Sequence, residues 1–221
     1  AAALILIPVL GMVIVSATQY KNGNAQDYYM EVQKENNKSF DENSTSKFSV
    51  PISQPYKQIN FANANGSSIE IHLNLDKKYG VKIPNYLKDQ IIFNVSNGTL
   101  NISFKEGFKL EEFRERLMIV LYAPTFEGLS AANLNNLHIT TKNEDLAVTL
   151  TDCNYFSVSV GEVTSTTIVN GDTTSHEVMN ENAIKNLKLN LNNSKFYISE
   201  LSLNSLDITS SNNSLISINE D

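Results

Sequence analysis

A ten-residue apolar pattern in the C-terminal part of the chain is the feature that most constrains its fold. From Leu137 onward, a short apolar-x-apolar segment returns about every ten residues. Lys188 interrupts the pattern once, with Leu187 and Leu189 on either side of it. A fixed short period indicates a chain built by stacking copies of one small unit. When decamers are counted from Leu137, the second position is aliphatic in most of them: Val148, Val158, Ile168, Val178, Ile198, Ile208 and Ile218.

The tenth position of the same decamers is apolar over most of the repeat. The pattern lapses at Thr166, His176 and Asn186, where we expect a loop to bulge out. Asn, Ser, Thr and Asp fill the positions between the apolar segments, and these residues favour turns. Each decamer therefore predicts a short strand followed by a polar turn. The apolar residues at the tenth position are Leu146, Phe156, Phe196, Leu206 and Ile216.

Two all-β folds could use this repeat. In a parallel β-solenoid, two decamers form one coil of about 20 residues, and stacked coils pair strands about 4.8 Å apart around a narrow aliphatic column. In an antiparallel meander, each decamer is one hairpin arm, and each reversal asks for a turn such as Asn-Gly. The decamers do not carry such a turn at each reversal, so we expect the solenoid.

The region from Phe48 onward carries further strand signals. Apolar and polar residues alternate over 69–75, as in a half-buried strand. The dipeptide Asn97-Gly98 separates two more alternating runs and predicts a β-hairpin, because both residues accept a positive φ. We also expect a strand at 56–61, a loop at 76–89 and a solvated crossover at 105–116.

The N-terminal segment is strongly apolar, and residues 1–15 carry no polar side chain. A transmembrane anchor needs about 20 apolar residues, whereas a cleaved secretory signal needs 7–15 followed by small residues. The sequence fits either, and the uncleaved anchor is preferred. In the alternative, Val15-Ser16-Ala17 places cleavage before Thr18. Both export the rest of the chain.

These signals divide the chain into three expected parts. Residues 1–17 form the anchor or signal, and residues 18–47 form a polar, flexible tether that buries too little apolar surface to fold. Residues 48–221 form the β-domain. Because the decamer is still running at Ile218, we expect this domain to continue beyond Asp221.

Charge and cysteine content exclude several classes of protein. The formal net charge is −7 and only two arginines occur, which argues against nucleic-acid binding. A single cysteine, Cys153, rules out an intramolecular disulfide framework and a Cys-built zinc site. With 29 Asn and 23 Ser, the composition is typical of an extracytoplasmic β protein.

No pattern predicts a catalytic site or a cofactor. The histidines His72, His138 and His176 are far apart and lack metal-ligand spacing. Cys153 lies in a predicted turn, and a catalytic thiol would need a His partner and a lowered pKa. Neither a Gly-x-Ser-x-Gly elbow nor a phosphate-binding glycine loop occurs. We therefore expect a protein that is not an enzyme.

One set of carboxylates follows the repeat. Asp152, Glu162 and Asp172 are spaced by ten residues, which would align them in one column of a solenoid. Such a column is a weak candidate for a calcium-binding edge. Two carboxyls facing one groove could also act as an acid pair on a polysaccharide. Like charges at this spacing can instead simply turn outward into water, which is the preferred interpretation.

The segment Leu117–Thr140 resembles the head GIN domain family, the adhesin head domains of bacterial envelope proteins. The shared order is a strand, a proline, an aromatic residue, a leucine and a second strand, here Val120, Pro124, Phe126, Leu129 and Ile139. A hairpin arm at Asn97–Ile102 precedes them, as in the family. The resemblance covers roughly residues 48–221. It implies a single-stranded right-handed parallel β-helix and brings no established catalytic residues. This chain departs from the family by using Asn and Ser where its coils often turn on Gly-Ser-Gly.

Three functions are compatible with these observations. The preferred one is a non-enzymatic, adhesin-like or scaffolding module of the bacterial cell envelope, periplasmic or at the cell surface. Its N-terminal segment would hold it at the membrane, and its Asn/Ser/Thr-rich surface would bind glycans or envelope proteins weakly and multivalently. The alternatives are the extracytoplasmic domain of a membrane-anchored sensor and, less favoured, a carbohydrate-active β-helix enzyme. The sequence leaves the oligomeric state open.

Overall fold

Strands dominate the part of the chain that the computed structural model describes, so the prediction of an all-β fold is confirmed. The chain divides into two compact units, Ala1–Lys38 and Ser39–Asp221. The first contains helix α2 (Ala25–Asn36), and the second contains the strands and a 3-10 turn, η1 (Asn85–Leu87). The described residues are 25–62, 66–108, 117–158, 162–169, 172–180, 184–198 and 203–218.

The strands follow one another with short connections. In chain order they are β1 (Lys47–Pro51), β2 (Gln58–Ala62), β3 (Ser68–Leu75), β4 (Gly80–Pro84), β5 (Ile91–Ser96), β6 (Thr99–Phe104), β7 (Leu117–Ala123), β8 (Gly128–Ala132), β9 (Asn136–Thr141), β10 (Asp145–Thr151), β11 (Tyr155–Val158), β12 (Glu162–Val169), β13 (Asp172–Asn180), β14 (Asn186–Asn192), β15 (Lys195–Ile198), β16 (Ser205–Ser211) and β17 (Leu215–Ile218).

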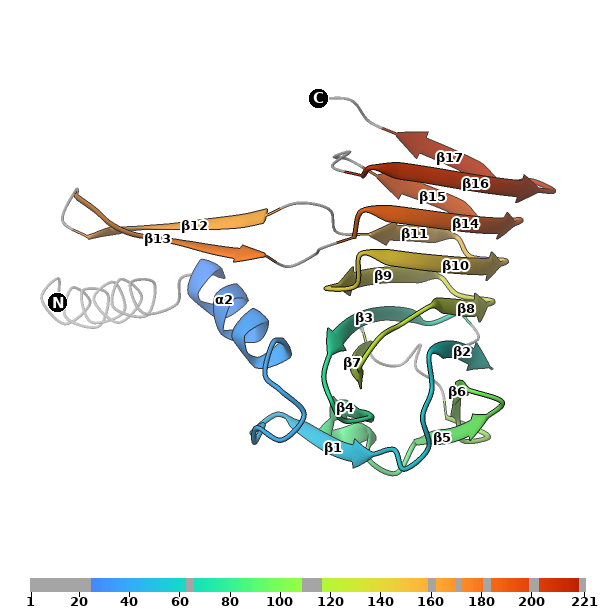
Figure 1. Cartoon of the computed structure of the whole chain (residues 1–221), viewed down its shortest axis with the longest axis horizontal. Helices are drawn as coiled ribbons and strands as arrows, with labels where there is room; N and C mark the ends of the chain where they lie inside the picture. Colours follow the sequence, from blue (N-terminus) through green and yellow to red (C-terminus); the bar gives the residue numbers. More distant parts are fainter. Residues whose placement is uncertain are drawn as a thin grey trace, which may run out of the picture. The chain divides into compact units, whose positions relative to one another are not determined.

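Two mixed sheets hold most of these strands. One has the order β1-β4-β7-β3-β9-β11-β15-β17, and the other has the order β16-β14-β10-β8-β2-β6-β5. From β8 onward, successive strands alternate between the two sheets, apart from the separate pair β12–β13 (Figure 1). The antiparallel pairs β1–β4, β4–β7 and β5–β6 lie at the N-terminal ends of the sheets and make them mixed.

The C-terminal strands pair in parallel with a regular offset. In one sheet Gly128 pairs with Ala147, and Asn186 pairs with Ser205. In the other sheet Lys195 pairs with Leu215. Each partner lies close to two decamers further along the chain, which is the expected length of one coil. Because these pairs are parallel, the antiparallel meander is wrong for these strands.

The pair β12–β13 interrupts this regularity. Asp145 pairs with Asn186, about twice the usual offset away, because the antiparallel hairpin of β12 and β13 is inserted between β11 and β14. The insertion coincides with the lapse in the tenth decamer position at Thr166 and His176. The expected loop is thus a hairpin. The dipeptide Asn170-Gly171 between the two strands is the hairpin signal that the decamer pattern obscures.

In each pair of successive strands, one from each sheet and here called a coil, a left-handed residue turns the chain between the two strands. The φ angle is 54–56° at Asn133, Asp152 and Asn212, and it is 49° at Asn193. Asn and Asp tolerate this region better than other non-glycine residues. The parallel ladder continues around the corner, since Asp152 N–H donates to the Asn192 carbonyl (3.0 Å) and Asn193 N–H to that of Ser211 (3.2 Å). Asn and Asp therefore replace glycine at these turns.

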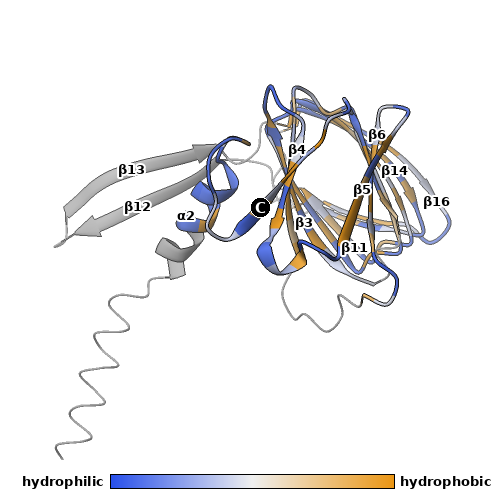
Figure 2. Cartoon of the chain, turned by 90° about the horizontal axis from the view of Figure 1, so that it is seen from below, coloured by the Kyte–Doolittle hydropathy of each residue, from blue (hydrophilic) through white to orange (hydrophobic). Residues whose placement is uncertain are grey.

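The core consists of apolar columns that run along the stacked strands. Leu129, Val148, Leu189 and Ile208 align in one sheet, and Leu137, Phe156, Phe196 and Ile216 align in the other. The apolar members of both decamer columns whose side chains the structure describes are buried up to β15, and the strands are the main hydrophobic part of this unit (Figure 2). In β17 the same positions are exposed: Ile216 is 37% and Ile218 is 42% exposed, against 0% for Phe196 and 3% for Ile198.

The segment before β1 differs from the expected flexible tether. Helix α2 occupies part of 18–47, and Ser39 begins the second compact unit. Phe40 packs edge-to-face on Tyr122 (ring centroids 5.4 Å apart). The buried Lys82 ammonium group donates to the carbonyls of Ser39 and Glu42, both at 2.8 Å. One aromatic ring and two backbone carbonyls therefore order a segment whose composition is polar.

The strands and turns expected between residues 56 and 116 are confirmed only in part. The Asn97-Gly98 hairpin is confirmed: Ser96 pairs with Thr99, and the φ angles of Asn97 and Gly98 are 51° and 73°. The strand over 69–75 is confirmed as β3, and that over 56–61 as β2. The expected loop at 76–89 is wrong, because β4 and η1 lie there. Much of the crossover expected at 105–116 lies outside the described residues.

The predicted anchor or signal, residues 1–17, lies outside the described residues. Among the helices that the structure describes, none is both long and apolar enough to cross a membrane.

Substitutions at the Asn193 corner test the role of the left-handed turn. We expect Asn193→Val to lower the free energy of unfolding by about 1–2 kcal/mol, because a β-branched residue is strained at positive φ. Asn193→Gly should stay within about 1 kcal/mol of wild type. The control Asn190→Val makes the same change in the middle of β14, at an exposed strand position, and should cost little. Urea unfolding measures all three, and equal losses for both Val variants would contradict the prediction.

Candidate functional site

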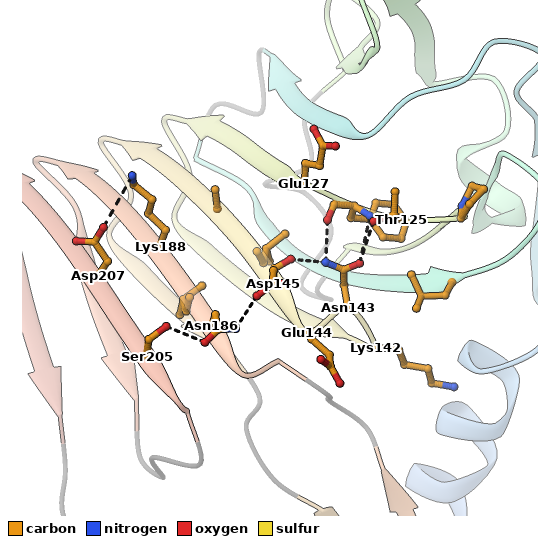
Figure 3. A pocket seen from close by; sticks show the side chains of 16 residues that line it. Thr125, Glu127, Lys142, Asn143, Glu144, Asp145, Asn186, Lys188, Ser205 and Asp207 are labelled. Carbon is orange, nitrogen blue, oxygen red and sulfur yellow. Dashed lines mark hydrogen bonds and ion pairs between the residues drawn. The ribbon is translucent and has the colours of Figure 1, made fainter.

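An open groove of about 760 Å³ lies where the chain enters the strands of the seven-stranded sheet (Figure 3). Its lining comes from the residues that precede or begin four neighbouring strands, β8, β10, β14 and β16, and from Leu75 at the end of β3. Paired strands lie about 4.8 Å apart. The groove therefore crosses successive coils instead of running along one strand. The lining segments are 124–127, 142–147, 186–188, Ser205 and Asp207.

The buried Asn143 side chain fixes the shape of the groove. Its Nδ2 donates to the Phe126 carbonyl (2.8 Å) and to the Asp145 carbonyl. Its Oδ1 accepts from the Phe126 backbone N–H (3.3 Å) and from the Thr125 hydroxyl (3.5 Å). Asn143 thus joins the turn after β7 to the corner before β10.

A row of polar side chains crosses the floor of the groove. Asn186 Nδ2 donates to Asp145 Oδ1 at 2.6 Å, and Ser205 Oγ donates to Asn186 Oδ1 at 2.8 Å. These three residues are direct register partners at the starts of β10, β14 and β16. Parallel stacking places identical positions of successive coils side by side, so one polar corner position becomes a ladder of hydrogen bonds.

The charged residues around the groove form ion pairs at its rim. The Glu127–Lys57 pair is 2.7 Å long, Glu144–Lys185 is 2.5 Å, and Lys188–Asp207 is 3.8 Å. The hydrogen bond and charge of Glu127 raise the pKa of Lys57. All six side chains are at least 49% exposed, so these pairs add little to stability. These ion pairs nevertheless involve three of the four carboxylates that line the groove.

The predicted acidic column does not fall in this groove. Asp152 is a left-handed corner residue that accepts from Asn193 Nδ2 (2.6 Å). The side chains of Glu162 and Asp172 lie outside the described part of the structure. Their backbones are at opposite ends of the β12–β13 pair: Glu162 pairs with Asn180, and Asp172 pairs with Val169. The calcium edge stays a prediction. Among described side chains, no three His, Cys, Asp or Glu are grouped to hold a metal ion.

Cys153 is a core residue of the corner. Its thiol is buried and donates to the Tyr155 carbonyl (3.5 Å). Burial raises the pKa of this thiol to about 11, so the nucleophilic thiolate is scarce near neutral pH. Its backbone N–H donates to the hydroxyl of Ser194, the residue at the same corner of the next coil (3.0 Å). Cys153 lies between β10 and β11, which confirms the prediction that it lies in a turn.

Two of the three histidines have defined surroundings. His72 is buried, with Nε2 3.1 Å from Glu70 Oε1. His138 Nδ1 lies 2.8 Å from Ser157 Oγ, a contact that the sequence did not predict. A serine beside a histidine can act as a nucleophile, but it also needs donors for the developing oxyanion. The β11 backbone around Ser157 is paired on both sides, with β9 and β15.

The aromatic residues are divided between the core and the surface. Tyr122, Phe126, Phe156 and Phe196 are buried, as core packing predicts. Tyr155 is exposed, and it stacks on Tyr197 of the neighbouring strand β15 (centroids 4.6 Å apart, planes at 14°). Tyr155 therefore belongs to the surface and not to the core.

Sequence patterns singled out two groove residues, Pro124 and Phe126, but for another reason. Asn143 and the polar row carry no motif, because they meet only through coil stacking. The available signal was a polar residue that recurs at the sequence spacing of one coil, as from Asn186 to Ser205. The inserted hairpin roughly doubles this spacing between Asp145 and Asn186, which hides the signal.

Replacing Asn143 tests whether it organises the groove. We expect Asn143→Ala to lower the free energy of unfolding by about 2–4 kcal/mol, because it leaves the buried N–H and carbonyl of Phe126 without their side-chain partners. The control Asn154→Ala removes an exposed amide that makes one long contact to Asn135 (3.3 Å) and should cost less than about 1 kcal/mol. Equal effects in urea unfolding would contradict this role.

The buried thiol predicts a pH dependence. An unfolded Cys has a pKa near 8.5, and the folded value is raised to about 11. The folded state therefore holds its proton longer, and stability is lost as pH rises from about 8.5 through 11, by up to roughly 3 kcal/mol. Cys153→Ser should lack this part of the loss, because a serine hydroxyl does not ionise in this pH range. Serine already occupies the same corner position at 194. Unfolding free energies of both proteins between pH 7.5 and 10.5 measure it. Parallel pH profiles would refute it.

Several solved structures match this chain at low sequence identity and low TM-score. No protein-family model and no curated protein matches the chain. A candidate adhesin from Parabacteroides merdae is 11% identical with a TM-score of 0.43, and the match covers 74% of this chain and 57% of that one. A candidate adhesin from Bacteroides fragilis is 13% identical with a TM-score of 0.37, covering 79% and 98%. A candidate lipid-binding protein from Parabacteroides distasonis is 11% identical with a TM-score of 0.28, covering 80% and 98%.

Proposed function

We propose that this chain is a non-enzymatic binding module of the bacterial cell envelope, adhesin-like or scaffolding, whose groove takes glycans or envelope proteins. The groove itself carries the proposal. It crosses four stacked strands and is lined by amide, hydroxyl and carboxylate groups that neighbouring coils hold in place. Polar groups repeated at a fixed spacing on a rigid scaffold suit weak contacts with a repeating polymer, and many such contacts add to useful avidity.

The proposal includes a single-stranded right-handed β-helix of the head GIN type. Three features support it: the parallel pairing of strands about two decamers apart, the alternation of strands between two sheets, and the backbone hydrogen bonds that continue around the corners. The order of β7, the Pro124 turn, β8 and β9 agrees with the family pattern. In this proposal, Asn at positive φ does what glycine does in other members.

The state of the groove carboxylates supports a non-enzymatic role. Glycoside hydrolysis needs one carboxyl to give a proton and a second to act as base or nucleophile. Glu127, Glu144 and Asp207 are in ion pairs, and Asp145 accepts from Asn186. Each of the four lining carboxylates therefore already contacts a neighbouring side chain.

Two features support an extracytoplasmic location. The apolar segment 1–15 fits an anchor or an export signal, and the Asn- and Ser-rich composition is typical of exported β proteins. A membrane-anchored sensor would share both features and would add a cytoplasmic domain. We therefore propose membrane attachment through the N-terminal segment, with the strand-containing unit on the outer side.

Protease treatment of intact source cells tests this placement. We expect the protease to release a fragment that begins near Ser39 and contains the groove, because Ser39–Asp221 is one compact unit. Mass spectrometry identifies the fragment, and cells with an opened outer membrane serve as the control. Release only from the opened cells would contradict a surface adhesin and favour a periplasmic scaffold.

A binding experiment tests the second part of the proposal. The full chain in neutral detergent should be retained on isolated envelope material, and no retention would refute the binding role.

A further inference from the structure

Lys142 is the groove residue that the rest of the site leaves without a counter-charge. It lies at the end of the groove opposite Lys188, Asp207 and Ser205 (Figure 3). Lys188 pairs with Asp207, whereas the Lys142 ammonium group makes no ion pair or hydrogen bond with a described residue. The side chain is half-buried, unlike the exposed lysines of the rim.

The groove carboxylates are already committed elsewhere. Glu127 and Glu144 pair with Lys57 and Lys185, which lie outside the lining. Asp145 is held by the Asn186 amide (2.6 Å). A small cation has no free set of carboxylates among these described lining residues, whereas an incoming anion meets one lysine with no described partner.

Partial burial makes that unpaired charge costly. Desolvation lowers the pKa of the Lys142 ammonium group, and no neighbouring carboxylate among the described residues raises it again. Lys142 is only partly buried, so its charge keeps part of its hydration, and a bound anion could offset the part that is lost. A bound carboxylate would supply the missing partner and gain a charge-assisted hydrogen bond.

The surroundings of Lys142 favour a saccharide over a peptide. Peptides commonly bind sheets by adding a strand to an open edge, but β10 and β14 are each paired on both sides. The groove instead offers side-chain amides and hydroxyls at the spacing of successive coils. The lining also includes Leu75, which is 47% exposed, and the exposed Pro124, which suit the apolar face of a sugar ring.

We propose that the groove binds a carboxylate-bearing polysaccharide, with the Lys142 ammonium group paired to a uronic acid carboxylate. This inference rests on the proposed binding function and names its ligand class. The sugar hydroxyls contact the polar row of Asp145, Asn186 and Ser205, while Leu75 and Pro124 contact the ring carbons.

Binding of the full chain, in neutral detergent, to polygalacturonate and to its fully methyl-esterified form tests the inference. We expect preference for the free acid and about tenfold weaker binding of the acid by Lys142→Ala, the size of a lost charged hydrogen bond. Lys142→Arg should keep most of the affinity. The matched control Lys195→Ala removes an exposed lysine that lies outside the groove and should bind within twofold of wild type. Thermal unfolding checks that each variant is folded.

Several outcomes would overturn the inference and leave the proposed function standing. One is equal binding of the acid and the ester, and another is an unchanged affinity in Lys142→Ala. A third is retention on envelope material with no binding of either polysaccharide. Stronger competition by polyglutamate than by polygalacturonate would assign the groove to an acidic peptide. Absence of binding both to the polysaccharides and to envelope material would contradict the inference and the proposed function together.

Discussion

Parallel pairing between strands one coil apart is the constraint on which the rest of the structure depends. A register shift of one residue would turn every inward side chain outward. The aliphatic columns prevent such a shift, because Leu129, Val148 and Leu189 can be buried together only in the observed register. Backbone hydrogen bonds and apolar burial thus select the same alignment. That agreement explains how a chain with few glycines and many asparagines holds a regular stack.

The corners and the groove are consequences of this alignment. Once the strands are in register, the residues at each corner are also in register, and they form rows: the left-handed Asn and Asp residues at one corner, and Asp145, Asn186 and Ser205 at the other. Neither row needs a motif within a single coil. The β12–β13 hairpin is inserted in the sequence between β11 and β14 and pairs only with itself. It therefore lengthens the sequence offset from β10 to β14, while β10 and β14 still pair directly.

Sequence reasoning succeeded where the interactions are local. The Asn97-Gly98 hairpin and the alternation of β3 depend on neighbouring residues, and both were predictable. It failed where distant residues decide. The segment at Phe40 is polar by composition, yet Tyr122 and the buried Lys82 hold it on the sheet. The calcium edge of Asp152, Glu162 and Asp172 stays a prediction, and the backbones of Glu162 and Asp172 lie at opposite ends of the antiparallel β12–β13 pair.

The sequence by itself determined the all-β class, the decamer period and its apolar columns, because hydrophobic periodicity is written residue by residue. Only the tertiary structure decided which strands pair, how the inserted hairpin leaves the stack, and which polar residues meet in the groove. The physical reason is that coil stacking joins residues a whole coil apart, or further where the hairpin intervenes, and no local preference of the chain encodes those contacts. Asn143 and Lys142 become neighbours of the groove in the same way. Their chemistry follows from what the stack places around them.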